Sequence, residues 1–186
     1  MRKKTTLFIV LGILLLLVLG YASKYNSFIT LEEEIDGKWA EVENNLQRRA
    51  DLIPNLVATV KGYASHEEKV FTEIAEARSR LLGAQGVEDK VKASSEMETA
   101  LGRLLMVVEQ YPELKADQRF AELQDELAGT ENRLSVARLR YNESVKSYNA
   151  RIRRFPGNIV AGMMGLEKRE YFQIKEEARE VPKVEF

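Results

Sequence analysis

An uninterrupted apolar run near the N-terminus constrains this chain more than any other feature. Residues 7–19 read LFIVLGILLLLVL and carry no charged side chain, and three basic residues at positions 2–4 directly precede them. Apolar surface of this extent is costly to leave in water. Residues 5–23 together approach the roughly 20 residues with which a helix crosses the apolar core of a bilayer. We therefore expect residues 1–24 to be a membrane anchor that contacts the bilayer through residues 5–23.

The same segment also fits a cleaved signal peptide. Gly20, Tyr21 and Ala22 place small residues where a signal peptidase cuts. We favour a retained anchor, because several apolar residues in sequence outweigh the polar flanks. Basic residues stay on the cytoplasmic side, and only Lys24 lies just beyond the run. This predicts a single-pass protein of the cell membrane, with a cytoplasmic N-terminus and an extracytoplasmic helical domain.

The charge balance bounds the possible partners. The chain has 28 Lys and Arg against 29 Asp and Glu, which gives a net charge of −1. A nucleic-acid-binding protein would usually show a basic excess, so no nucleic-acid partner is predicted. The charges are interleaved, as on a solvated helical surface. With no cysteine in the chain, disulfides and thiol chemistry are excluded.

The rest of the chain indicates an all-α fold. Apolar residues recur three and four positions apart over four stretches, and no stretch alternates as strands do. The expected helices lie near 28–52, 54–83, 87–110 and 115–155. Short connections favour an antiparallel, up-and-down four-helix bundle following the N-terminal transmembrane helix. The predicted domains are the anchor (1–24), the bundle (25–156), and a C-terminal apolar segment and tail (157–186).

Each expected helix has a stripe of core positions. The first stripe is Phe28, Leu31, Ile35, Trp39, Val42 and Leu46. The second is Leu56, Val60, Phe71, Ile74 and Leu81, and the third is Val87, Val91, Met97, Leu101, Leu104, Leu105 and Val108. The fourth is Phe120, Leu123, Leu127, Thr130, Leu134, Ala137, Tyr141, Val145, Tyr148, Ile152 and Phe155.

Two local features leave alternatives open. Pro54 either begins a new helix, with Asp51 near its cap, or lies within a continuous kinked helix, and Gly62 is the other candidate break. Residues 157–172 combine apolar side chains with a basic edge. They either return to the membrane interface or fold back and cap the bundle. Residues 181–186 are expected to be a frayed tail.

A search for chemistry yields no catalytic, cofactor-binding or metal-ligating residue. His66 is the only histidine, whereas a zinc-protease helix needs two and a di-iron bundle needs two Glu-x-x-His motifs. The sequence contains neither a Gly-x-Ser-x-Gly elbow nor a Gly-x-x-x-x-Gly-Lys phosphate loop. We therefore predict a protein that is not an enzyme and needs no cofactor.

Polar residues beside the stripes are interpreted as structural. Tyr-Asn pairs begin at Tyr25, Tyr141 and Tyr148, and amide groups at a helix seam can fix register. Charged residues also lie beside apolar positions, namely Arg48, Arg49, Asp51, Glu67, Arg78, Glu109, Glu131 and Arg138. A buried charge must be paired, so we expect ion pairs between helices, such as Arg49 or Arg78 with Glu131 or Glu109.

Several strings resemble the LemA family of bacterial membrane proteins. They are residues 47–57 (QRRADLIPNLV), 60–63 (VKGY) with 66–67 (HE), 109–115 (EQYPELK), 123–127 (LQDEL), 130–131 (TE), 137–142 (ARLRYN), 148–149 (YN) and 155–156 (FP). The resemblance covers roughly residues 25–172. It implies an N-terminal anchor followed by a four-helix antiparallel bundle, and it implies no settled activity and no site residues.

Anchor, bundle and resemblance together favour a non-enzymatic interaction or scaffold protein at the bacterial membrane, with a protein partner that the sequence does not identify. The alternative is a membrane-surface or lipid-organising protein that uses the 157–172 segment. An enzyme is the third hypothesis, and it depends on His66 being recruited into a site by folding.

Overall fold

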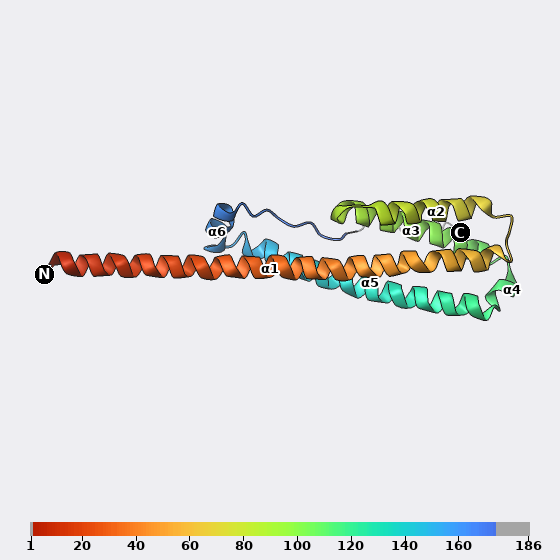
Figure 1. The fold of residues 1–186 in the computed structure, drawn as a ribbon, viewed down its shortest axis with the longest axis horizontal. Helices are drawn as coiled ribbons and strands as arrows, with labels where there is room; N and C mark the ends of the chain where they lie inside the picture. The colour runs from red at the N-terminus through yellow and green to blue at the C-terminus, as the bar shows by residue number, and fades with distance from the viewer. Residues whose placement is uncertain (1, 174–186) are drawn as a thin grey trace, which may run out of the picture. The chain divides into compact units, whose positions relative to one another are not determined.

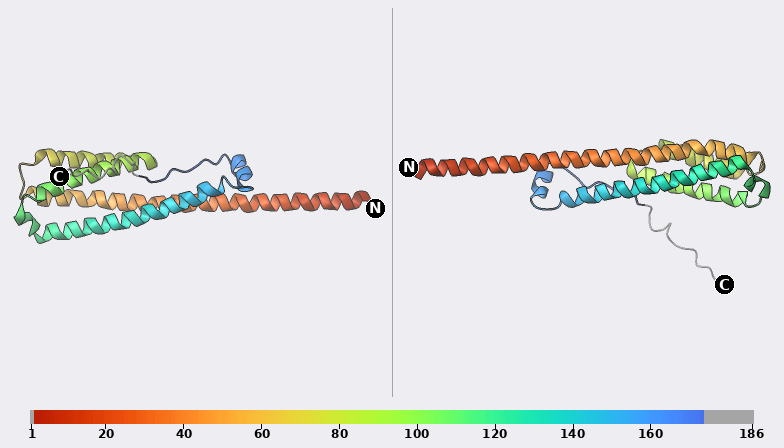
Figure 2. Two further views of the ribbon diagram at one scale, coloured as in Figure 1. Left: turned by 180° about the vertical axis from the view of Figure 1, so that it is seen from behind. Right: turned by 90° about the horizontal axis from the view of Figure 1, so that it is seen from below.

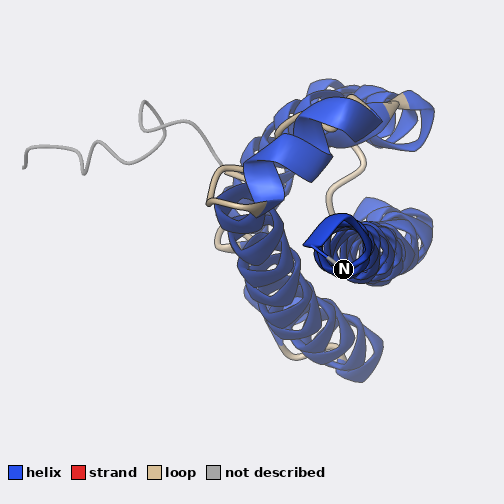
Figure 3. Cartoon of the chain, turned by 90° about the vertical axis from the view of Figure 1, so that its left-hand side faces the viewer, coloured by secondary structure: helices blue, strands red, loops and turns tan. Residues whose placement is uncertain are grey.

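The computed structural model describes residues 2–173, apart from the side chains of residues 2, 3, 5 and 6. Within that range the helices are α1 (Arg2–Lys61), α2 (Glu68–Gly83), α3 (Gly86–Val108), α4 (Pro112–Lys115), α5 (Gln118–Arg151) and α6 (Gly157–Met164). Figure 3 shows helices and loops but no strand in the described residues, so the all-α prediction is confirmed. The predicted tail at 181–186 lies outside the described residues.

The chain divides into two compact units, which are described separately. Among the described residues, unit 1 comprises 2–38 and 142–169, and unit 2 comprises 39–141 and 170–173. The helices α1 and α5 contribute to both units. The predicted domain boundaries at 24/25 and 156/157 follow a different criterion, namely the change in composition along the chain. They stay predictions.

Unit 2 contains the later part of α1, all of α2, α3 and α4, and the first part of α5. In Figures 1 and 2, α2 and α3 lie side by side. Their facing stripes supply buried residues such as Ile74, Leu81, Met97 and Leu104. Helix α2 ends at Gly83, as predicted. Gly86, the first residue of α3, has φ of 74°, a conformation that suits glycine.

Of the two alternatives open at Pro54, the structure shows the continuous helix, so the expected boundary at residues 52–54 is wrong. Helix α1 continues through Pro54 to Lys61, and the break falls at residues 62–67, which begin at the other candidate, Gly62. Proline has no N–H to give to the carbonyl four residues earlier, which belongs to Ala50. Arg78 of α2 supplies the missing donor, because its Nε lies 2.8 Å from that oxygen. The helix instead ends where Gly62 N–H donates to Thr59 O at 3.2 Å, a tighter turn.

The last long helix begins later and ends earlier than expected. Its N-terminus is capped by Asp117, whose Oδ1 accepts the Phe120 N–H at 2.9 Å and whose Oδ2 accepts the Tyr63 hydroxyl at 2.8 Å. Both hydrogen bonds lower the pKa of Asp117, and the bond from the Phe120 N–H has the larger effect. At the other end, α5 stops at Arg151 and Phe155 is 81% exposed, so its assignment to the core was wrong. Pro156 keeps Phe155 out of helical geometry, and the chain leaves the helix before it, in a turn over residues 152–156.

Unit 1 contains the first part of α1, the last part of α5, and α6. One face of α6 is buried through Gly157, Val160 and Ala161. The opposite face exposes Ile159 and Met163. The buried face agrees with packing of this segment onto the helices, and contact of residues 157–172 with lipid stays a prediction.

Gly157 provides a test of this packing. A Cβ atom there would lie 2.7 Å from the Arg151 carbonyl oxygen and 3.2 Å from Phe28 Cζ. Gly157→Ala should therefore destabilise the protein by roughly 1–3 kcal/mol, because backbone must shift. Gly162→Ala in the same helix meets nothing within 4 Å. This control should leave the melting temperature unchanged or raise it, since alanine favours helix. Thermal unfolding in mild detergent measures both, and equal melting temperatures for the two variants would contradict the packing of α6.

Candidate functional site

A partly buried charge cluster lies in unit 2 where α1, α3 and α5 meet. Arg49 from α1 is 6% exposed, and its Nη1 lies 2.6 Å from Glu131 Oε2 on α5 and 3.6 Å from Glu98 Oε1 on α3. Arg138, two turns beyond Glu131 on α5, has its Nη1 3.6 Å from Glu131 Oε1 and 4.0 Å from Glu98 Oε1. Its Nη2 donates a hydrogen bond of 2.8 Å to Ser94 Oγ on α3. These five residues form the charge cluster.

The charges of the cluster balance, with two guanidinium groups against two carboxylates. Burial lowers the pKa of Arg138, and the two carboxylates oppose that shift. A guanidinium nevertheless stays protonated. The Nε atoms of Arg49 and Arg138 are buried without a hydrogen-bond partner among the described residues. Arginines held in this way fix the axial register of three helices at some cost in stability.

The ion pairing was predicted in part. The pairing of Arg49 with Glu131 is confirmed. Arg78 instead donates a hydrogen bond to the Ala50 carbonyl, and its Nη2 lies 3.7 Å from Asp51 Oδ1. Glu109 forms an ion pair with Lys115. Sequence reasoning missed Glu98 and Ser94. Their four-residue spacing on the apolar face of α3 was the available signal, because polar residues at that spacing share one side of a helix.

An aromatic slot adjoins the cluster. The Phe172 ring, 4% exposed, lies over the Arg138 guanidinium with 4.6 Å between the guanidinium carbon and the ring centroid. The Trp39 ring centroid is 6.3 Å from that of Phe172 and 5.2 Å from that of Tyr141. The Tyr141 hydroxyl donates a bond of 2.9 Å to the Glu170 carbonyl. We use the name Phe172 slot for the three residues Trp39, Arg138 and Tyr141, which hold residues 170–172 through these contacts.

The second Tyr-Asn pair of α5 lies in unit 1 and has a structural role. Asn149 donates from Nδ2 to the Arg169 carbonyl and accepts the Arg169 N–H at Oδ1, both at 2.9 Å. The Tyr148 hydroxyl lies 3.4 Å from Glu32 Oε1. Burial, followed by the Glu32 charge, raises the pKa of Tyr148. An amide that satisfies both backbone groups of one residue holds an extended segment in place, which agrees with the structural interpretation.

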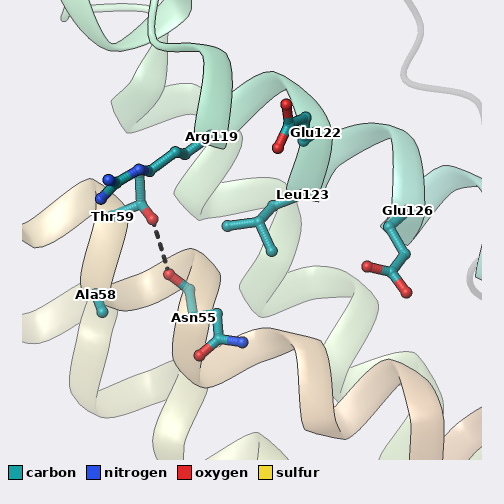
Figure 4. Close-up of a pocket in the computed structure, with 7 residues that line it drawn as sticks. All are labelled: Asn55, Ala58, Thr59, Arg119, Glu122, Leu123 and Glu126. Atoms are coloured by element: carbon teal, nitrogen blue, oxygen red, sulfur yellow. Dashed lines mark hydrogen bonds between the residues drawn. The ribbon is translucent and has the colours of Figure 1, made fainter.

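His66 lies exposed in the turn between α1 and α2. Within the residues that the structure describes, no group of three or more histidine, aspartate and glutamate side chains is placed to hold a metal ion. An open groove of unit 2 is drawn in Figure 4, and α1 and α5 line it with Asn55, Ala58, Thr59, Arg119, Glu122, Leu123 and Glu126. The hydrogen bond drawn there, from Thr59 Oγ1 to Asn55 O at 3.0 Å, lies within α1.

The described residues thus form an all-helical protein. Its N-terminal helix is apolar enough to cross a membrane, judged by length and composition alone. The chain belongs to the LemA family, whose family model matches residues 38–186. The apolar segment precedes the matched region.

Three relatives extend this assignment. Magnetosome protein MamQ 2 of Paramagnetospirillum magneticum is 29% identical over 178 residues, which cover 82% of this chain and 65% of that protein. Magnetosome protein MamQ of Magnetospirillum gryphiswaldense is 28% identical with the same coverage. Protein LemA of Metamycoplasma hominis is 25% identical over 157 residues, covering 84% of this chain and 72% of that protein. The chain thus spans 65% of the length of the MamQ relatives.

The bond between Arg78 and the Ala50 carbonyl is testable by a double-mutant cycle. Arg78→Ala should cost about 1–2 kcal/mol, because the freed carbonyl loses its donor. The same change in a Pro54→Ala background should cost less, since the alanine then has an N–H that donates to this carbonyl within the helix. Urea unfolding in mild detergent measures both losses. Arg80→Ala is the control, because Arg80 pairs with Glu96, Nε to Oε2 at 2.6 Å, and not with the Ala50 carbonyl, so its cost should be the same in both backgrounds. Equal costs in the two backgrounds would contradict the assigned role.

The charge cluster is tested by a matched pair of substitutions on α5. Glu131→Gln should destabilise by about 2–3 kcal/mol, because it leaves Arg49 buried with a weaker partner, and the partial exposure of Glu131 moderates the loss. Glu126→Gln removes the same charge from an ion pair with Arg48 in which both side chains are well exposed, at 57% for Arg48 and 43% for Glu126. That control should stay within about 0.5 kcal/mol of the wild type. Similar losses in the free energy of unfolding for the two variants, measured in urea, would show that the cluster contributes no more than an exposed ion pair.

Proposed function

We propose that this LemA-family chain is a single-pass membrane protein with a cytoplasmic N-terminus and its helical units on the extracytoplasmic side. One observation carries the proposal. Between Leu7 and Leu19, every large apolar side chain of α1 is 50–71% exposed, and none packs inside the protein. No soluble helix gains from such exposure, whereas a bilayer supplies the missing apolar surroundings.

Magnitudes support this proposal. The Leu, Ile, Val and Phe residues of that segment would together contribute on the order of −4 to −7 kcal/mol to insertion if all lay near the bilayer centre. A helix of residues 2–23 is about 33 Å long at 1.5 Å per residue, close to the roughly 30 Å thickness of the apolar core. The basic residues at positions 2–4 favour a cytoplasmic N-terminus.

We further propose that unit 2 is an antiparallel four-helix bundle that acts as a scaffold or interaction module and not as an enzyme. Helices α1, α3 and α5 share the charge cluster, and Arg78 links α2 to α1. An ion pair joins Arg103 of α3 to Glu73 of α2 at 2.5 Å. The names of the relatives specify a magnetosome protein and LemA, and neither names a reaction. Exposed Val136 and Leu139, 47% and 59% exposed on one side of α5, offer an apolar surface to a protein partner.

Single cysteines test the topology cleanly, because the native chain has none. Gln124→Cys should react with a membrane-impermeant maleimide in spheroplasts, whereas Lys4→Cys should react only after lysis. Both proteins should stay in the membrane after carbonate extraction. A mature chain that lacks its first two dozen residues, or equal labelling of both cysteines before lysis, would overturn the anchor.

The same tagged chain tests the interaction role. A pull-down from detergent-solubilised membranes should recover a stable partner with the wild type and with Gln124→Ser. Recovery should fall with Leu139→Ser, which removes exposed apolar surface. Repeated recovery of no partner, with the chain intact in the membrane, would count against a scaffold.

A further inference from the structure

The Phe172 slot holds one residue of an otherwise solvated segment. Phe172 is buried, whereas Glu170 and Gln173 are exposed and Tyr171 is 38% exposed. Residues 166–173 form neither helix nor strand. A segment without regular structure that inserts a single aromatic side chain into a pocket is how an extended peptide docks on a folded partner, with the aromatic residue as its anchor.

The slot recognises two chemical features of this segment. The Arg138 guanidinium lies over the Phe172 ring, with its carbon 4.6 Å from the ring centroid, which is within the range of a cation–π contact. The Trp39 ring is tilted by 40° to the Phe172 ring, with 6.3 Å between the centroids. The Tyr141 hydroxyl binds a main-chain oxygen, that of Glu170, which any sequence would provide. The segment is thus held by one aromatic side chain and by a main-chain carbonyl two residues earlier, while Tyr171 between them is 38% exposed.

The charge cluster holds the Arg138 guanidinium through contacts that do not involve Phe172. Glu131, Glu98 and Ser94 contact the nitrogen atoms of the Arg138 guanidinium. Those contacts lie at the edge of the planar group and leave its face to an aromatic ring. The guanidinium is thus preorganised by helices α3 and α5, and preorganisation lowers the entropic cost of binding.

We propose that the Phe172 slot is a recognition site for an extended, phenylalanine-containing segment of a partner protein, and that residues 170–172 of this chain occupy it in cis until such a segment displaces them. The inference rests on the proposed interaction role and names the class of partner. A tethered segment competes with an effective concentration that reaches millimolar values for short flexible linkers. The intact chain therefore binds a free peptide weakly, and loss of the cis anchor opens the site.

Trp39 is a built-in reporter, because it is the only tryptophan in the chain and forms part of the slot. The probe is a synthetic peptide with the sequence of residues 166–173, LEKREYFQ, titrated into the full-length chain in mild detergent. With Phe172→Ala, the emission of Trp39 should change and saturate. With the wild type, the midpoint should lie at least about ten-fold higher, since the cis segment competes. The same peptide with alanine in place of phenylalanine should give no change.

Tyr171→Ala is the matched control, because it alters the exposed neighbour and should titrate like the wild type. Phe172→Leu keeps apolar volume without the ring and replaces Phe172→Ala if that variant unfolds. No saturable change in either folded Phe172 variant, or equal midpoints for variant and wild type, would overturn the proposal. Wild-type dimers that Phe172→Ala abolishes in sedimentation would assign the slot to a second copy and overturn the partner assignment. Membrane labelling and pull-down can succeed while the titration fails, so the two proposals are separable.

Discussion

The pairing of charges inside unit 2 is the constraint on which the rest depends. Arg49 is almost fully buried, and removing it from water without partners would cost several kcal/mol. Apolar stripes tolerate sliding by a turn or a heptad, whereas Arg49 meets Glu131 and Glu98 at one register only. The same carboxylates orient Arg138, so the aromatic slot inherits its shape from the cluster. Structural and recognition features therefore share one set of interactions.

Most of the helical core could be predicted because its signal is local. Three- and four-residue spacing alone identified Ile35, Met97 and Leu134, which are all buried. The same rule failed at Leu105, which is 40% exposed, while Val107 of the same helix is buried. Periodicity locates a stripe but cannot say which edge residue faces the neighbouring helix.

The remaining features depend on residues far apart in the sequence. The continuity of α1 through Pro54 is supported by a side chain 28 residues away from the Ala50 carbonyl, and the Ser94–Arg138 bond spans 44 residues. The pairing of Arg49 with Glu131 was accessible because buried charges require partners. The contribution of Phe172 was not, since an isolated aromatic residue near the C-terminus carries no periodic signal. The contribution of Glu98 was not predicted either, although its four-residue spacing from Ser94 is visible in the sequence.

The arrangement at Pro54 also bears on the stiffness of α1. A proline within a helix normally provides a hinge, because one rung of the hydrogen-bond ladder is missing. Here the missing hydrogen bond is replaced by one from the Arg78 guanidinium of α2, so the flexibility of α1 at this point depends on α2. Loss of the Arg78 contact would leave the Ala50 carbonyl without this donor and make α1 easier to bend at Pro54.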